Sequence, residues 1–517
     1  MNGAQALIRT LVGCGVDVCF TNPGTSEMQF VAALDEVPAM RAVLGLFEGV
    51  ATGAADGFGR MAERPAATLL HLGPGLGNGI ANLHNARRAR TPVVNVVGDH
   101  AVTHLAYDPP LASDIASLAR PVSRWYRSAT TPEGLAADAA DAVAAAYGPP
   151  SGVATLVVPA DLTWSEAGGP AAARPRPSPR PVGEEAVTGA AKALRSGEPV
   201  ALLLGGAAMR RPGLDAAGRV AQATGARLLA ETFPARHERG AGIPAPERLA
   251  YLAEFAMAQL AGTRHLVLAG ATAPVSAFAY PNLPGDLVPE GCEVHTLADP
   301  AEGEDAVGAL RALAETLGAG SGAAPGPPPG RPVPPTGALD ARAVAEAVGA
   351  LLPEDAIVSD EGNTEGIFVS GATAGAPPHD WLCLTGAAIG QGMPVALGAA
   401  VACPGRRVLS LQADGSAMYT LQSLWTQARE GLDVTTVVLA NRSYGILELE
   451  LSRVGAAAGG PRARRMLRID DPELDFAALA AGMGVPSSRA RTAEEFSEQL
   501  ARALATPGPS VVEAVLV

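Results

Sequence analysis

Short apolar runs alternate along this chain with alanine-rich stretches whose apolar residues recur every three or four positions. The runs predict buried β-strands, and the stretches between them predict amphipathic helices. Strands that alternate with helices form βα units, so the pattern predicts an α/β fold built from doubly wound parallel sheets. The clearest strand candidates are residues 92–97, 153–158, 200–204, 265–269, 356–359, 407–411, 434–439 and 510–515.

Two segments, 168–182 and 318–336, lack this periodicity and are rich in Pro, Gly and Ala. Such composition is typical of extended linkers. A length of 517 residues also favours about three domains over one. We therefore expect three α/β domains, and their predicted bounds are 1–167, 183–317 and 337–517.

The composition narrows the class of protein. Hydrophobic residues make up 48% of the chain and charged residues 17%, which is typical of a globular protein with large cores. The net charge of −14 repels nucleic acid, so we expect no nucleic-acid partner. Five cysteines without a CxxC pair suggest neither a disulfide framework nor a zinc site.

The first 20 residues carry Arg9 and Asp17 within their apolar stretch and do not have the pattern of a signal peptide, so we expect a cytoplasmic protein. Residues 381–405 contain no charge and are long enough to span a membrane. However, this run also contains Gln391, Pro394 and five glycines. We interpret it as a buried turn and helix, and we expect no membrane partner.

The third part of the chain contains the sharpest chemical pattern. Asp414 follows one predicted strand, and Asn441 follows the next. A right-handed βαβ crossover brings the ends of such strands together. One carboxylate, one amide oxygen and a backbone carbonyl at Ser443 would suit Mg²⁺, which takes its remaining ligands from water and phosphate oxygens. The simpler interpretation is that Asp414 only caps a helix.

The segment around Asp414 resembles a known family. The sequence DGS, with Asn at this distance after it and TGAAIGQGMPVALGAA before it, is similar to the diphosphate-and-magnesium motif of thiamine diphosphate enzymes. The acetolactate synthase and benzoylformate decarboxylase branch is the most similar. The resemblance implies, in chain order, a pyrimidine-binding, a central and a diphosphate-binding domain. Ala413 stands where the family motif usually has Gly.

The resemblance also implies roles for individual residues. In GLFEGVATG, Glu48 matches the glutamate that binds the aminopyrimidine ring and drives its activating tautomer. Ile389 matches the bulky residue under the bent cofactor, and the carbonyl of Ala387 would hold its amino group. Further expected cofactor contacts are Thr25, Asn78, Asn363, Thr364, Gly415 and Ser416.

The family chemistry implied here is attack on a 2-oxo acid followed by loss of carbon dioxide. The enamine that remains is then protonated by a decarboxylase or added to a second carbonyl by a carboligase. We expect an acetolactate synthase-like enzyme that protonates or ligates the enamine, with a benzoylformate decarboxylase-like simple decarboxylase as the alternative. His71 matches a decarboxylase histidine, whereas Thr25 replaces that enzyme's serine. His100 and His104 are further acid–base candidates.

Other hypotheses stay open at this point. The glycines between Gly73 and Gly79 imitate a dinucleotide-binding loop, which would suit a NAD-dependent oxidoreductase. A protein that binds the cofactor without catalysis is another possibility. We expect no tightly bound FAD, because ALLLGGAAMRRPG is a weak match to a nucleotide loop. Family sites lie between subunits, so the resemblance implies a homodimer or homotetramer.

Overall fold

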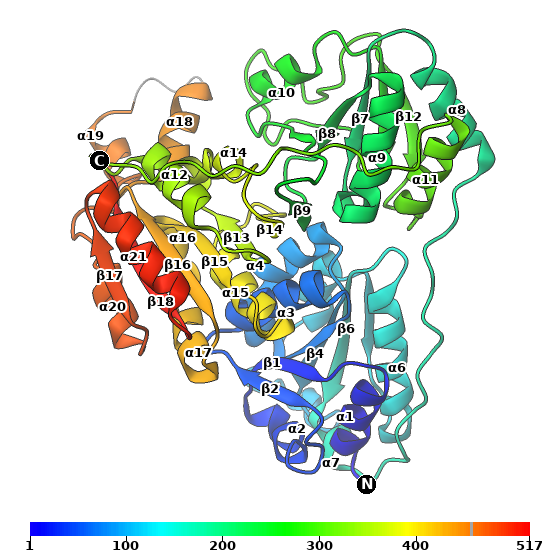
Figure 1. Cartoon of the computed structure of the whole chain (residues 1–517). Helices are drawn as coiled ribbons and strands as arrows, with labels where there is room; N and C mark the ends of the chain where they lie inside the picture. The colour runs from blue at the N-terminus through cyan, green and yellow to red at the C-terminus, as the bar shows by residue number, and fades with distance from the viewer. Residues whose placement is uncertain (455–458) are drawn as a thin grey trace.

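The computed structural model describes residues 1–454 and 459–517. They form three α/β parts, each built around its own sheet (Figure 1). The predicted fold class is confirmed, and each of the eight strand candidates overlaps an observed strand, with differences of at most two residues at the ends. The extended segment 168–182 runs along the outside of the molecule from the first part to the second (Figure 1).

The first sheet has the strand order β2-β1-β3-β4-β6-β5, and all its pairs are parallel. Its strands are β1 (Val18–Asn22), β2 (Arg41–Leu44), β3 (Ala66–Leu70), β4 (Val93–Asp99), β5 (Trp125–Ser128) and β6 (Val153–Pro159). Its helices are α1 (Gly3–Gly13), α2 (Met28–Ala33), α3 (Glu48–Ala62), α4 (Leu72–Ala89), α5 (Ile115–Ala119), α6 (Pro132–Tyr147) and α7 (Ala160–Trp164).

The middle part is a five-stranded parallel sheet in the order β10-β8-β7-β11-β12. Its strands are β7 (Val200–Leu204), β8 (Arg227–Ala230), β10 (Glu247–Arg248), β11 (His265–Ala269) and β12 (Glu293–Ala298). Its helices are α8 (Glu184–Leu194), α9 (Arg211–Thr224), α10 (Ala253–Leu260) and α11 (Ala306–Thr316).

The third sheet has the order β17-β18-β16-β15-β13-β14-β9. Its strands are β13 (Ile357–Glu361), β14 (His379–Cys383), β15 (Val408–Ala413), β16 (Val434–Ala440), β17 (Ser487–Ala490) and β18 (Ser510–Val515), with β9 (His237–Arg239) contributed by the middle of the chain. Its helices are α12 (Ala341–Leu351), α13 (Asn363–Gly366), α14 (Val369–Ala372), α15 (Gly392–Ala402), α16 (Asp414–Thr420), α17 (Ser423–Glu430), α18 (Gly445–Arg453), α19 (Pro461–Arg465), α20 (Phe476–Gly482) and α21 (Ala493–Ala505).

Two features of the third sheet differ from the sequence prediction. β9 pairs antiparallel with β14, so a segment between the two predicted linkers extends the last sheet. Two helices, α16 and α17, replace the single helix expected between β15 and β16. The uncharged run 381–405 contains the end of β14, a turn and the buried helix α15. Within the part of the chain that the structure describes, no helix is both long and apolar enough to cross a membrane.

The first and third parts are joined where helix α3 crosses helix α15. A Cβ on Gly57 would lie 2.1 Å from the carbonyl oxygen of Val395, and a Cβ on Gly398 would lie 1.8 Å from that of Ala54. Because any side chain at these positions would collide with backbone, only glycine allows the two helices to approach this closely. The apolar side chains around the crossing belong to one continuous core that includes both sheets.

A buried ion pair lies beside this crossing. Asp56 and Arg60 form a salt bridge of 2.6 Å between side chains that are 0% and 1% exposed. The Arg60 guanidinium also donates to the carbonyl oxygens of Cys383 and Ala235, at 2.7 and 3.2 Å. Asp56 in turn accepts hydrogen bonds from Thr91 and Gln391. The pair therefore links all three parts of the chain at one point.

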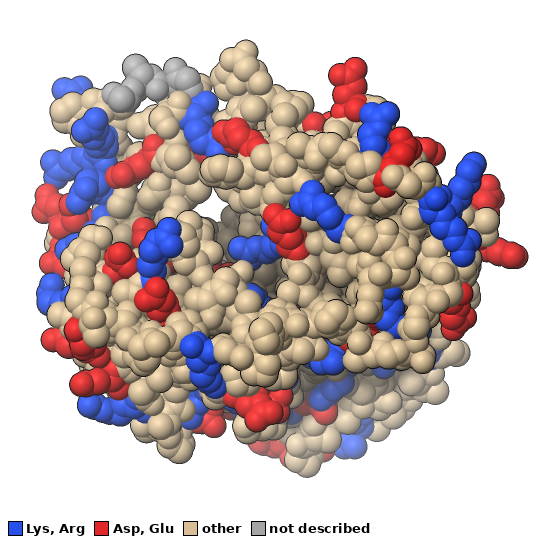
Figure 2. Space-filling model, turned by 45° about the horizontal axis from the view of Figure 1, so that its top comes forward, with Lys and Arg blue, Asp and Glu red and all other residues tan. Residues whose placement is uncertain are grey.

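On the face drawn in Figure 2, acidic and basic side chains are interspersed among large uncharged areas. No continuous basic surface runs across that face. This distribution matches the low charge content of the sequence.

Candidate functional site

The carboxyl ends of β1, β2, β3 and β4 lie side by side at one edge of the first sheet, which is where open parallel sheets bind ligands. Glu48 begins helix α3 shortly after β2 and is half-buried. The Asn78 amide, in α4, donates a hydrogen bond of 3.0 Å to Oε2 of Glu48. Two of the predicted cofactor residues thus touch each other, although they are 30 residues apart in the sequence.

His71 follows β3 directly, and its ring lies on the bare face of Gly24. A Cβ on Gly24 would lie 2.2 Å from the ring, so this wall of the site requires glycine. Nδ1 of His71 lies 2.8 Å from Oε2 of Glu27. Oε2 of Glu27 also accepts a hydrogen bond from the Gly24 amide. Because Nδ1 makes the contact with Glu27, Nε2 is the ring nitrogen that Glu27 does not engage.

Glu27 lies at this edge as well, although its local sequence does not predict a role in the site. Its side chain is 1% exposed, and its Oε1 has no hydrogen-bond partner within the described residues. Burial raises the pKa of this carboxyl, and His71 offsets part of that shift. The available signal was the Glu at the end of NPGTSE, three residues after the glycine that begins the turn. Only the folded chain, however, reveals its contact with His71.

Of the other candidates on this edge, Thr25 and His104 are exposed, whereas His100 is half-buried. Thr25 begins a short 3-10 helix (Thr25–Glu27) just after β1, and its side chain faces solvent. His100 follows β4, two residues beyond Gly98, and a Cβ on Gly98 would meet Oε1 of Glu27. The His100 and His104 rings lie 5.9 Å apart, and His104 is exposed. These residues share the His71 edge without a hydrogen bond to its ring.

The second group of candidates lies at the carboxyl ends of β15 and β16, which pair in parallel from Val408 and Val434 to Ala413 and Leu439. Asp414 and Asn441 follow these neighbouring ends, as the sequence predicted. The Asp414 carboxylate is 2% exposed and accepts from the backbone amides of Gly415 and Arg442, at 2.7 and 2.6 Å. The Asn441 amide oxygen accepts from the backbone amide of Ser443 at 3.0 Å.

The electrostatics of Asp414 suit a cation. Burial raises its pKa to about 6, while hydrogen bonds from the Arg442 and Gly415 amides lower it in part. Among the described residues, no Lys or Arg side chain forms an ion pair with Asp414; the Arg442 guanidinium instead lies near Glu473. A buried carboxylate beside an amide oxygen, without a cationic partner, is a donor set that fits Mg²⁺.

The remaining diphosphate-side candidates surround this pair. Asn363 donates a hydrogen bond of 3.0 Å to the Ser416 hydroxyl. A Cβ on Gly445 would lie 3.1 Å from the Thr364 hydroxyl and 3.5 Å from the Asn441 amide nitrogen, so both groups lie beside Gly445. The Gly415 amide donates to the side chain of Asp414 at the start of the seven-residue helix α16, and its contact with the diphosphate stays a prediction. Ala413 has φ −67°, so the methyl group that departs from the family motif causes no backbone strain.

The turn before α15 carries Ala387 and Ile389. It is held by Glu361, a buried carboxylate that accepts from the Gly390 and Gly392 amides at 2.6 Å each. Asn85 holds the same turn through the Ala388 carbonyl. Within residues 1–454 and 459–517, the carbonyl of Ala387 accepts no hydrogen bond, which leaves it available for a ligand.

Four of the nine non-glycine residues with positive φ in the described chain lie at these candidates. Leu72, Asn363, Ala387 and Arg442 all have φ between 49° and 59°, a region that residues with a side chain rarely adopt. Each of the four is itself a candidate or directly follows one: His71, Asn363, Ala387 and Asn441. Strained residues of this kind cluster at functional sites, where the surrounding fold holds them in place.

The glycine run 73–79 does not form a strand-to-helix loop. These glycines lie within α4, and Gly73 and Gly79 pack against Ser113 and Thr52. Since a dinucleotide fingerprint needs its glycines in the turn before the helix, this arrangement removes the main support for a NAD-binding site.

Comparison with known proteins agrees with this geometry. Residues 1–117 match the family described as thiamine pyrophosphate enzyme, N-terminal TPP binding domain, and residues 362–514 match its C-terminal TPP binding domain. A protein of Mycobacterium tuberculosis H37Rv named "Putative acetolactate synthase large subunit IlvX" is 59% identical over 100% of this chain and 99% of its own.

Two further relatives extend this comparison. Benzoylformate decarboxylase of Pseudomonas aeruginosa is 30% identical over 96% of each chain. The solved structure of a thiamine diphosphate-dependent 4-hydroxybenzoylformate decarboxylase of Rhodococcus jostii RHA1 superposes with a TM-score of 0.86, covering 100% of this chain and 99% of that one at 24% identity. Because the sequence identity to this structure is only 24%, this similarity shows the fold alone.

Proposed function

Because the chain belongs to the thiamine pyrophosphate enzyme family, of the acetolactate synthase and benzoylformate decarboxylase type, we propose that it decarboxylates a 2-oxo acid with thiamine diphosphate and Mg²⁺. The remaining acyl unit would then be joined to a second carbonyl compound, as in acetolactate synthases. The observation that carries the proposal is that the Asp414 carboxylate is buried beside Asn441 and has no cationic partner among the described residues.

Asp414, Asn441 and the carbonyl of Ser443 would hold Mg²⁺, with Asn363, Thr364, Gly415 and Ser416 around the diphosphate. When bound, thiamine diphosphate would supply the carbon nucleophile and the electron sink for loss of carbon dioxide. Glu48 would hold a proton at the aminopyrimidine ring, with Asn78 keeping its carboxylate in place. Ile389 and the Ala387 carbonyl would fix the orientation of the rings.

His71 would face the substrate. Contact with Glu27 orients its ring and leaves Nε2 to hold the substrate carboxylate or to move a proton. This pair also supports a second candidate function, simple decarboxylation, because a positioned acid can deliver a proton in place of a second carbonyl compound. Thr25, His100 and His104 would line the same side of the pocket.

The proposal is tested by incubating the enzyme with pyruvate, 2-oxobutyrate, benzoylformate or phosphonopyruvate. Carbon dioxide and ligated product are measured together, with and without cofactor and Mg²⁺. We expect carbon dioxide from at least one acid, dependent on both additions, with a ligated product. An aldehyde as the only product would favour the decarboxylase. Cofactor binding without carbon dioxide from any 2-oxo acid would indicate a non-catalytic protein.

Replacing the metal-binding carboxylate should release the cofactor. Asp414→Ala should weaken thiamine diphosphate binding in Mg²⁺ by about 100-fold or more, since even the partners of metal ligands are worth about 10–100-fold. Isothermal titration measures the affinity. Asp355→Asn, an exposed position just before β13 in the same sheet, is the matched control and should bind normally. Unchanged affinity in Asp414→Ala would remove the metal assignment.

Two variants should distinguish activation of the cofactor from the choice of product. Glu48→Gln should slow exchange of the thiazolium C2 proton and reduce every reaction, because it acts before substrate arrives. His71→Ala should leave that exchange intact while it lowers turnover by about 10²- to 10⁴-fold or changes the product ratio. Glu27 is a positioning residue. Glu27→Gln should therefore have a weaker effect than His71→Ala, of the same kind, and should shift the pH profile of turnover.

If C2 exchange slows in His71→Ala, or if turnover and product ratio stay unchanged, His71 is structural. The acid–base group would then have to be sought at His100 or His104.

A further inference from the structure

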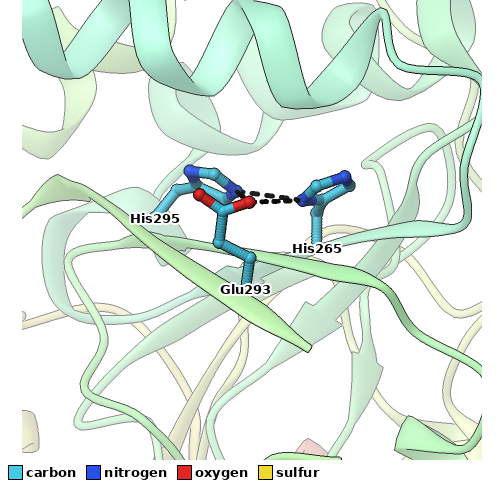
Figure 3. Close-up of side chains that lie close together, drawn as sticks. All are labelled: His265, Glu293 and His295. Atoms are coloured by element: carbon cyan, nitrogen blue, oxygen red, sulfur yellow. Dashed lines mark hydrogen bonds and ion pairs between the residues drawn. The ribbon is translucent and has the colours of Figure 1, made fainter. Parts of the chain in front are cut away.

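Three side chains with metal-binding atoms converge in the middle part of the chain, at the first residues of β11 and β12 (Figure 3). The two strands are parallel neighbours, and their register pairs His265 with Glu293. His295 lies two residues further along β12, so all three side chains project from one face of the sheet. The cluster lies on a different sheet from every residue of the candidate site.

The distances between the ligating atoms are short. Nδ1 of His265 lies 3.1 Å from Nε2 of His295 and 3.6 Å from Oε2 of Glu293. Nε2 of His295 lies 3.9 Å from the same carboxylate oxygen. Zinc–nitrogen and zinc–oxygen bonds of about 2.0–2.2 Å in a tetrahedron place ligand atoms roughly 3.3–3.6 Å apart. The three observed separations bracket that range.

A fourth residue orients the cluster. Nε2 of His265, the ring nitrogen that faces away from His295, lies 3.0 Å from Oε2 of Glu198. A histidine that ligates a metal commonly donates its other N–H to a carboxylate, which fixes the tautomer and turns the free lone pair toward the ion. With Nε2–H directed to Glu198, the lone pair of Nδ1 points toward His295 and Glu293.

The two histidines and the glutamate differ in their exposure to solvent. The His265 and His295 side chains are 12% and 18% exposed, so the fold holds both rings, whereas Glu293 is 68% exposed. The carboxylate thus lies on the solvent side of the cluster, where an ion could enter and keep a water as fourth ligand. Two imidazole nitrogens with one carboxylate oxygen favour a transition metal over Mg²⁺, which prefers oxygen ligands.

We propose that His265, Glu293 and His295 form a binding site for a zinc-type transition-metal ion, with Glu198 as the positioning residue for His265. The ion would tie β12, an edge strand of its sheet, to β11. It would also reach, through Glu198, the segment between α8 and β7. The site is separate from the proposed Mg²⁺ site and does not depend on it.

The test uses the full chain, stripped of metals and reloaded with thiamine diphosphate and excess Mg²⁺ so that the other site is filled. Zn²⁺ is then titrated in competition with a chromogenic chelator, and Co²⁺ is added separately to record its visible spectrum. We expect one Zn²⁺ per chain and the intense visible bands of tetrahedral Co²⁺. His265→Ala and His295→Ala should lower Zn²⁺ affinity by about 100-fold or more, and Glu198→Gln by about 10–100-fold.

The matched control is Glu290→Gln, which removes one exposed carboxylate just before β12 and should bind Zn²⁺ normally. Glu293→Gln changes a solvent-facing side chain that folding does not depend on. The loss of Zn²⁺ affinity in this variant therefore reports on the site itself. Circular dichroism checks the histidine variants. The proposal is overturned if the wild-type chain binds no Zn²⁺ under these conditions, or if Zn²⁺ affinity and the Co²⁺ spectrum are unchanged in both histidine variants.

Discussion

The crossing of α3 and α15 is the contact on which the arrangement of this molecule depends. Gly57 and Gly398 bring the two helix backbones into direct contact, and the core around them includes apolar side chains of the first and third sheets. The Asp56–Arg60 pair at this crossing is fully buried and would be costly without its partners. Hydrogen bonds from Arg60 to Cys383 and Ala235, and to Asp56 from Thr91 and Gln391, satisfy both charges.

This contact also fixes the two groups of candidate residues. Glu48 begins the helix whose later turns make the crossing, and the turn with Ile389 leads directly into α15. One face of α4 connects them: Asn78 holds Glu48, Asn82 donates to the carbonyls of Gly49 and Gly390, and Asn85 holds Ala388. Glu48 and this turn are therefore set on one rigid support within each chain, and in a dimer with sites between its subunits they would contribute to two different sites.

Much of the fold could be predicted from the sequence, because buried parallel strands are continuous apolar runs that can be recognised locally. The positions of Asp414 and Asn441 could be predicted as well, since polar residues at the ends of neighbouring parallel strands must lie close together. Their function as metal ligands stays a prediction, as does the role of Glu48.

The features that were missed depend on contacts between distant segments. Glu27 meets His71 across 44 residues, and Glu361 supports the Ile389 turn across about 30 residues. Neither contact leaves a pattern in the local sequence. Strand β9 is three residues long, too short for a periodicity, and joins a sheet more than 100 residues away. The His265 cluster depends on the register of β11 and β12, which the apolar pattern of the two strands does not reveal.

We propose that Glu48 and Asp414 serve one cofactor and that two copies of the chain contribute them. The most direct test mixes inactive Glu48→Gln and Asp414→Ala proteins that carry two different tags and allows their subunits to exchange. The hybrid dimers, which carry both tags, are then purified. In each hybrid dimer one site would hold both intact residues and the other would hold both lesions. Purified hybrids should therefore show about half of wild-type turnover, because each has one working site out of two. If purified hybrids show no turnover, each site takes both residues from a single chain and the claim is wrong.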